Sequence, residues 1–172
     1  YLPKPPLTVQ ARNRLVPLPD GDRLLAQVYA PPAQAPSLVR KTIVCAFHGL
    51  GGHSERPYMQ RVVDVGTARG CEVWAINHRG CGAGRGLAKG IYHSGVAADL
   101  SSVFAEVRRR EPAARILGLG FSLSASALLL CLGTAIPMGL AYVWWQPTAF
   151  FQVLRNGSYV SVGSWANPVR PS

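Results

Sequence analysis

Apolar and polar positions in the first thirty residues follow the short alternation of β-strands. Residues 7–16 and 23–30 both have strand character, and the segment between them contains Asp20-Gly21, two residues that tolerate the positive φ angles of a tight turn. The pattern therefore predicts an antiparallel β-hairpin, followed by a Pro-rich loop over residues 31–41.

Beyond residue 41 short apolar segments alternate with amphipathic ones. The apolar segments are typical of strands buried on both faces of a sheet, and they cover residues 42–47, 71–77 and 115–120. Helical spacing of apolar residues predicts helices over 57–69, about 95–110 (with Ser94 as N-cap) and 124–132. This alternation indicates parallel βαβ units. We therefore predict an α/β fold in which an N-terminal β-hairpin precedes parallel βαβ units.

Composition agrees with a folded chain. The 172 residues correspond to about one domain, and 48% hydrophobic against 15% charged residues excludes a largely disordered protein. The four cysteines contain no CxxC pair, which favours free thiols in a reducing compartment over a disulfide framework. They are Cys45, Cys71, Cys81 and Cys131. A cytoplasmic location is therefore expected.

The charge of +10 does not by itself indicate a nucleic-acid partner. The 18 Lys and Arg residues are dispersed apart from Arg108–Arg110, so we predict no nucleic-acid binding. His53 and His78 lack the spacing of metal ligands, and no metal is expected. Gly118 and Gly120 lack the third glycine of a dinucleotide fingerprint, so no cofactor is expected either.

The most informative point is the junction between the strand 115–120 and the helix after it. Its sequence, Gly120-Phe121-Ser122-Leu123-Ser124, approaches the pattern G-x-S-x-G, in which a sharp strand-to-helix turn lifts the central hydroxyl out of the sheet. Ser124 stands where the pattern has its second glycine. The pattern predicts Ser122 as a catalytic nucleophile.

A second Gly-rich loop follows the strand 42–47. Acyl transfer needs two backbone N–H donors aimed at the developing oxyanion. In enzymes with this elbow one donor follows the nucleophile, here Leu123, and the other lies in a loop after an earlier strand, here Leu50. Gly49 lets the loop approach the substrate closely, and His48 is expected to order it by hydrogen bonding.

Four motifs in order carry a family resemblance over residues 42–133. They are HGLGG (48–52), NHRGCGAG (77–84), IYHSG (91–95) and GFSLSASAL (120–128). Together they resemble the α/β-hydrolase superfamily and, within it, its YheT-like branch. The resemblance implies a serine hydrolase scaffold, a small-molecule ester or acyl substrate, Ser122 as nucleophile and the Leu50 and Leu123 amides as oxyanion donors.

The chain departs from that family after Ser122. On this fold the triad partners follow the serine as Asp or Glu and then His, yet no Asp, Glu or His follows here. We therefore expect weak or no activity from the chain as given. Residues 1–133 are interpreted as the N-terminal part of the domain and 134–172 as an atypical apolar tail, the result of truncation or a frame change. The C-terminal strands would then be missing or replaced, leaving the edge of the strand 115–120 unpaired or paired with the tail.

Three alternatives accompany the hydrolase interpretation. The first is a non-catalytic remnant or binding module that keeps the pocket without turnover. A lesser one is a membrane-anchored protein with a span at 126–145, because residues 116–154 contain no charged side chain. The third is a cryptic dyad of His93 and Asp99, set against a purely structural role for Asp99. The oligomeric state is unknown from the sequence.

Overall fold

The fold is known from a computed structural model, which describes residues 9–93, 96–133, 141–144 and 150–153. The strands in these residues are β1 (Ala11–Pro17), β2 (Arg23–Tyr29), β3 (Thr42–Phe47), β4 (Glu72–Asn77), β5 (Arg115–Phe121), β6 (Ala141–Trp144) and β7 (Phe150–Val153). The helices are α1 (Pro57–Ala68), α2 (Ala97–Arg110), α3 (Leu123–Gly133) and the short 3-10 helix η1 (Gly82–Gly84). The strands form a single sheet in the order β1-β2-β4-β3-β5-β6-β7.

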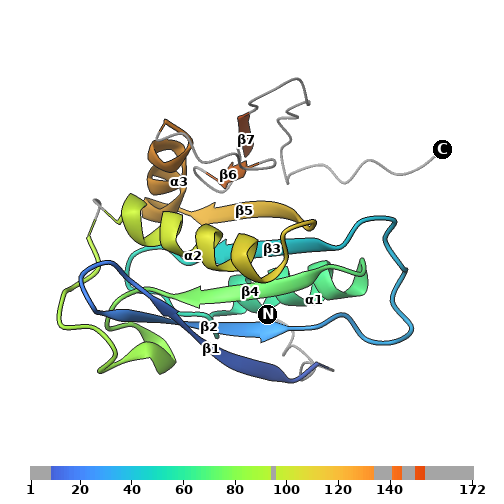
Figure 1. Cartoon of the computed structure of the whole chain (residues 1–172), viewed down its shortest axis with the longest axis horizontal. Helices are drawn as coiled ribbons and strands as arrows, with labels where there is room; N and C mark the ends of the chain where they lie inside the picture. The colour runs from blue at the N-terminus through green and yellow to red at the C-terminus, as the bar shows by residue number, and fades with distance from the viewer. Residues whose placement is uncertain (1–8, 94–95, 134–140, 145–149, 154–172) are drawn as a thin grey trace.

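The sheet combines an antiparallel hairpin with a parallel centre (Figure 1). β1 pairs antiparallel with β2, and β2 pairs antiparallel with β4. β3 lies between β4 and β5 and runs parallel to both. The predicted hairpin and parallel βαβ units are therefore confirmed, and the sequence-predicted strands agree with the observed ones except at their ends.

Helices cover the sheet on both faces and create two cores. α2 and α3 pack on one face, while α1 packs on the other (Figure 1). Successive residues of β4 alternate between them: Trp74 and Ile76 belong to the α2 side, and Val73 and Ala75 to the α1 side. A strand with apolar residues in both sets must be buried on both faces, which is why its sequence reads as a continuous apolar segment.

The outer edge of β5 is paired over its carboxyl-terminal half. β6 runs parallel to it from Gly118 to Phe121, and β7 pairs antiparallel with β6. Both strands come from the segment interpreted as an atypical tail. The edge is thus paired with the tail, one of the two expected outcomes; the remaining residues of 134–172 lie outside the described ranges.

The helix α2 starts differently from the prediction. It begins at Ala97, and Val96 at its N-cap position makes no side-chain capping bond. The predicted cap, Ser94, lies outside the described residues. No helix in the described part of the chain combines the length and apolar character needed to cross a bilayer. Of the proposed span, residues 126–133 belong to α3.

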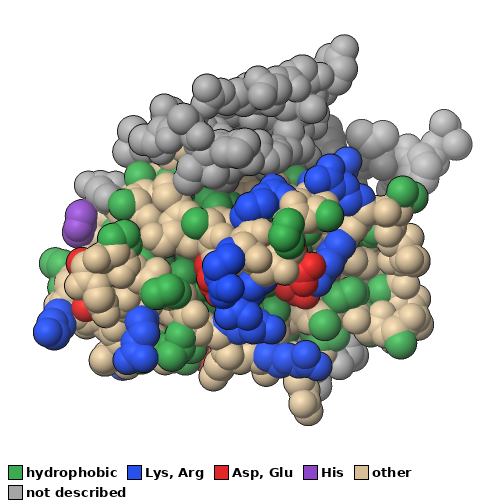
Figure 2. Space-filling view, viewed as in Figure 1, with side chains coloured by type: hydrophobic (Ala, Val, Ile, Leu, Met, Phe, Trp, Pro, Cys, Tyr) green, Lys and Arg blue, Asp and Glu red, His purple; other side chains and the backbone are tan. Residues whose placement is uncertain are grey.

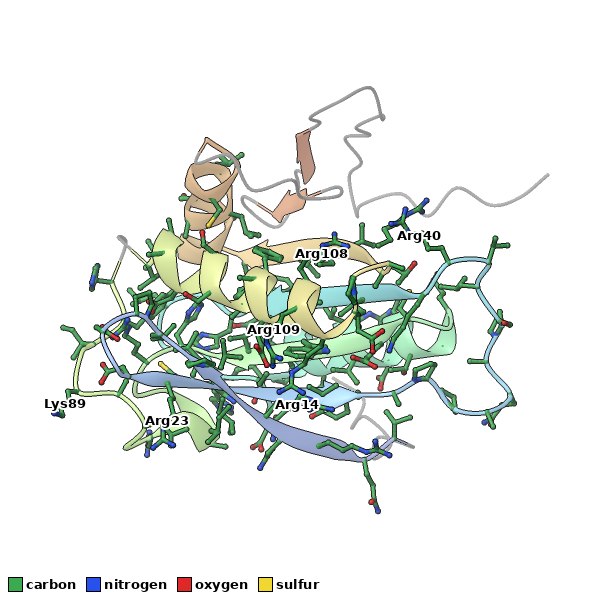
Figure 3. The ribbon with its side chains drawn as sticks, in the orientation of Figure 1. Arg14, Arg23, Arg40, Lys89, Arg108 and Arg109 are labelled. Carbon is green, nitrogen blue, oxygen red and sulfur yellow. The ribbon has the colours of Figure 1, made fainter. Side chains whose placement is uncertain are left out.

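Basic side chains are spread over the face that carries α2. Figure 2 shows Lys and Arg groups there interspersed with apolar and acidic ones, and Figure 3 shows that the labelled ones come from several elements. Arg108 and Arg40 donate to backbone carbonyls of the loop after α2. Arg109 and Arg110 both pair with Glu106. These cations therefore hold local structure together.

One arginine joins three parts of the fold. Arg79, in the loop after β4, donates through Nε and Nη2 to the two carboxylate oxygens of Asp99 on α2, each at 2.7 Å. Its Nη1 also contacts Asp20 at 2.6 Å and Asp22 at 2.7 Å in the hairpin turn. Asp99 therefore has a structural role in this ion pair, the role that the sequence analysis set against a dyad with His93.

We predict that removing this cation destabilises the fold strongly. Arg79 and Asp99 are both largely buried, and truncating one member of a buried pair leaves the other charge unpaired. We expect Arg79→Ala to lower the free energy of unfolding by about 3 kcal/mol. Urea unfolding measures the change, with the exposed Arg61→Ala as control, for which about 0.5 kcal/mol or less is expected. Equal losses in both variants would contradict this role.

Candidate active site

The residues singled out by their sequence gather at one edge of the sheet. β3, β4 and β5 are parallel, so their carboxyl ends point the same way (Figure 1). In register, Phe47 lies opposite Ile76 on one side and Gly120 on the other. The chain therefore leaves the sheet at neighbouring points toward His48, His78 and Ser122.

Ser122 occupies a sharp turn between β5 and α3. Its φ is 53°, and among the described residues it is the only one other than glycine with a positive φ. A left-handed backbone at a residue with a side chain costs about 1 kcal/mol or more and persists only where the surroundings impose it. The Ser122 side chain is exposed. The turn thus holds a hydroxyl outside the sheet.

Gly120 makes this turn sterically feasible. A Cβ atom at Gly120 would lie 2.7 Å from the carbonyl carbon and oxygen of Ser124 and 2.8 Å from the amide nitrogen of Ala125. These are backbone atoms of α3, and they cannot move aside as the end of a flexible side chain could. The absence of a side chain at Gly120 therefore lets the first turn of α3 fold back against β5.

The loop after β3 lies against the turn. A Cβ atom at Gly49 would be 3.1 Å from the Cβ of Ser122 and 3.2 Å from the carbonyl oxygen of Phe121. The Gly49 amide donates to the hydroxyl of Tyr58 on α1 (3.3 Å), and the Tyr58 ring packs on Phe121 with centroids 4.6 Å apart. Tyr58 thereby ties the loop to the residue that precedes Ser122.

Each of the two predicted amide donors directly follows one residue of the Gly49–Ser122 contact in the chain. Leu50 follows Gly49 directly and is 73% exposed. Leu123 is the first residue of α3, where helical amides have no acceptor within the helix. The structure thus brings together four of the predicted residues around Ser122: Gly49, Leu50, Gly120 and Leu123.

Ser124, the residue in place of the usual glycine, is a buried hydrogen-bonding centre. Its hydroxyl donates to the carbonyl oxygen of His48 at 2.5 Å. Because its single proton is used there, it must accept from the other two neighbours, His78 Nε2 at 2.8 Å and the Tyr92 hydroxyl at 3.1 Å. The side chain that the sequence marks as a departure therefore links the turn to the loop after β3.

The two buried histidines have fixed proton positions. His48 Nε2 accepts from the His78 amide (3.2 Å), so its Nδ1 carries the proton and donates to the Gly49 carbonyl (2.8 Å). His78 donates from Nε2, and its Nδ1 has no hydrogen-bond partner among the described residues. Burial lowers the pKa of both groups, that of His78 to about 3. Both rings are therefore neutral and committed to structure.

The contact between His78 and Ser124 has the distance of a nucleophile–base pair, but burial rules out that role. Both side chains are inaccessible to solvent, and the Ser124 proton points to a backbone carbonyl. The His78 ring stacks on Tyr92, with centroids 4.0 Å apart and planes 5° from parallel. Sequence reasoning missed His78 and Tyr92. His78 lies in the NHRGCGAG motif, directly after a strand that ends at this edge, and Tyr92 lies in the IYHSG motif.

Sequence comparison identifies related proteins over the same region. The model of the family described as serine aminopeptidase, S33, matches residues 39–138. The chain is 32% identical over 130 residues to the putative esterase YheT of Escherichia coli (strain K12), a match that covers 73% of this chain and 37% of that relative. The chain thus spans little more than a third of the length of this relative.

Solved structures show the same fold. XC6422 from Xanthomonas campestris, an α/β serine hydrolase without a lid, has a TM-score of 0.63 at 22% identity, covering 76% of this chain and 59% of its own. The esterase Pf2001 of Pyrococcus furiosus has a TM-score of 0.63 at 16% identity, covering 76% and 50%. These TM-scores show a shared fold, and the partial coverage agrees with the predicted partial α/β-hydrolase architecture.

We predict that Gly120→Ala disrupts the turn. The new methyl group meets backbone atoms of α3, so we expect a loss of about 2–3 kcal/mol in the free energy of unfolding, measured by urea titration. Gly118→Ala is the matched control on the same strand, because its methyl group meets only the side-chain ends of Phe104 and Leu128. A loss in Gly118→Ala as large as in Gly120→Ala would refute the steric argument.

The buried neutral His78 predicts a loss of stability in acid. Its pKa is about 3 in the folded chain against an ordinary value of 6.5. The unfolded chain therefore binds more protons between these values, and the free energy of unfolding falls as the pH drops through this window. Between pH 7 and pH 5, protonation of His78 in the unfolded chain lowers the free energy of unfolding by about 2 kcal/mol.

Urea unfolding at the two pH values measures this effect. We expect His78→Asn to show a pH dependence smaller by about 2 kcal/mol than the wild type. An unchanged dependence in His78→Asn would mean that this ring is not held neutral by the fold.

Proposed function

The chain belongs to the serine aminopeptidase family S33, and from this membership we propose that it is a serine hydrolase of carboxylic ester or acyl substrates with Ser122 as its nucleophile. The observation that carries the proposal is the left-handed turn at Ser122, which exposes the hydroxyl beside the Gly49 loop. In this proposal residues 1–133 carry the nucleophile and the oxyanion donors, and residues 134–172 follow as an apolar tail.

Hydrogen bonding supports Leu50, rather than Gly49, as the donor from the loop. The Gly49 amide is already used by the Tyr58 hydroxyl, whereas no acceptor for the Leu50 amide is found in the described part of the chain. Leu123 supplies the second donor from the first turn of α3. Attack of the Ser122 oxygen on a substrate carbonyl would place the developing negative charge between these two amides.

The Ser124 centre supports the geometry of this site. Its bond to the His48 carbonyl fixes the start of the loop, and the bond from His48 Nδ1 to the Gly49 carbonyl fixes the next peptide. Donors aligned before the reaction need no reorganisation when charge develops. His48, Gly49 and Gly120 are therefore proposed as supporting residues, and Ser122 as the residue that bonds to the acyl group.

The proposal includes slow turnover by this chain alone. A serine hydroxyl is a weak nucleophile without a base to take its proton. No Asp, Glu or His follows Ser122 in the sequence, and the described histidines His48 and His78 are held in other hydrogen bonds. The same observation favours a second candidate function, a binding module that recognises an ester or acyl compound without hydrolysing it.

An activity-based fluorophosphonate probe tests the two functions. We expect the probe to phosphonylate Ser122, because the amide donors polarise the P=O group as they would a carbonyl. Ser122→Ala should abolish labelling, read by intact-protein mass spectrometry. Ser126→Ala, which removes another hydroxyl of the same segment, should keep it. Labelling that persists in Ser122→Ala refutes the nucleophile, and no labelling of the wild type favours the binding module.

A further inference from the structure

A cavity of about 550 Å³ lies beside the proposed oxyanion loop. Its walls come from two Gly-rich segments, residues 51–56 before α1 and residues 80–85 after β4. The first segment begins directly after Leu50, the proposed oxyanion donor. The cavity is therefore a neighbour of the site around Ser122 and is formed by residues to which the proposed mechanism assigns no role.

Two arginines that line this cavity form no ion pair among the described residues. Arg56 donates from Nη2 to the Gly51 carbonyl at 3.2 Å, and no ion pair of Arg56 or Arg85 is found within the described ranges. The acidic residue of the lining, Glu55, accepts a bond from Gln27 at 3.4 Å. The lining thus carries two guanidinium groups against one carboxylate.

Some other cations of this chain, unlike these two, are neutralised by ion pairs. Arg79 contacts three aspartates. Lys41 pairs with Glu72 and Glu111. A guanidinium binds carboxylate and phosphate groups through two parallel N–H donors. The two guanidinium groups of Arg56 and Arg85 outnumber the one carboxylate of the lining, which makes the cavity suitable for an anionic ligand.

The glycine backbone adds further donors to the wall. Gly51, Gly80 and Gly82 have φ angles of 69°, 67° and 51°. In the described structure their amides have no protein acceptor. Turns with left-handed residues leave N–H groups free to converge on an anion. A Cβ atom at Gly51 or Gly80 would meet nothing within 4 Å, so the wall is open at these two positions.

We propose that this cavity binds an anionic group, a carboxylate or a phosphate, carried by the substrate of the Ser122 site. The inference rests on the proposed function for the location of the ester, and it adds the class of substrate. The Cα atoms of Gly49 and Gly51 are at most about 7.6 Å apart along two peptide units. Because Gly49 lies against Ser122, the cavity wall at Gly51 lies within about 12 Å of the nucleophile.

Isothermal titration of the full chain tests this without requiring turnover. The probes are suberate, a linear dicarboxylate that spans most of this distance, its neutral diamide, and inorganic phosphate. We expect suberate or phosphate to bind, and the diamide to bind more weakly than suberate. Stronger binding of suberate identifies the anion as a carboxylate, and stronger binding of phosphate identifies it as a phosphate. Binding should weaken as sodium chloride is raised, because the contacts are ionic.

The double variant Arg56→Gln, Arg85→Gln should bind the anion at least about tenfold more weakly, the loss of one or two charged hydrogen bonds. Arg61→Gln, which removes a charge from α1 outside the cavity, is the matched control and should bind like the wild type. Circular dichroism and melting temperature confirm that each variant is folded. Equal affinities in the double variant and the wild type, no binding of either anion, or a diamide that binds as tightly as suberate would overturn the proposal.

The failure of this inference can be told apart from failure of the hydrolase proposal. Ser122→Ala should lose fluorophosphonate labelling and keep anion binding, because the cavity does not include that residue. Arginine-dependent binding of an anion with no labelling of Ser122 would leave the cavity in place and reject the nucleophile. Labelling of Ser122 without such binding would reject the anionic substrate alone.

Discussion

The backbone at Ser122 is held in a left-handed conformation, and the rest of the site is arranged around that constraint. β5 delivers the chain to the sheet edge, and α3 must start at once in another direction. Gly120 allows this because its missing side chain leaves room for the backbone of Ser124. The parallel pairing of β3 with β5 then brings the Gly49 loop against the turn. A strained residue and two neighbouring glycine contacts together define the geometry.

A buried polar cluster holds the loop in place behind this turn. Ser124, His48, His78 and Tyr92 share a set of hydrogen bonds that is saturated except at His78 Nδ1. In a low-dielectric interior such bonds are strong, and an unpaired polar atom is costly. The family that this chain resembles has glycine at position 124. The serine side chain is accommodated here because its hydroxyl is hydrogen-bonded within the cluster. The Ser124 hydroxyl donates to the carbonyl oxygen of His48 and so fixes the start of the Gly49 loop.

Sequence patterns predicted most of the fold because the decisive signals are local. The Asp20-Gly21 turn, the continuous apolar strands and the Gly120 junction each depend on residues close in the chain. The contacts that sequence could not supply are long-range. Arg79 reaches from the loop after β4 to the hairpin turn and to α2, and His78 meets Ser124 across 46 positions. Their partners follow from strand register, which periodicity alone does not give.

In the proposed mechanism the Ser122 oxygen and the Leu50 and Leu123 amides converge on one point. A crystal structure of the chain after reaction with a fluorophosphonate measures this directly. We expect phosphorus bonded to the Ser122 oxygen and a phosphoryl oxygen within hydrogen-bond distance, about 3 Å, of both amides. A phosphoryl oxygen that points to solvent, or a helical φ at Ser122 in the unreacted chain, would contradict it.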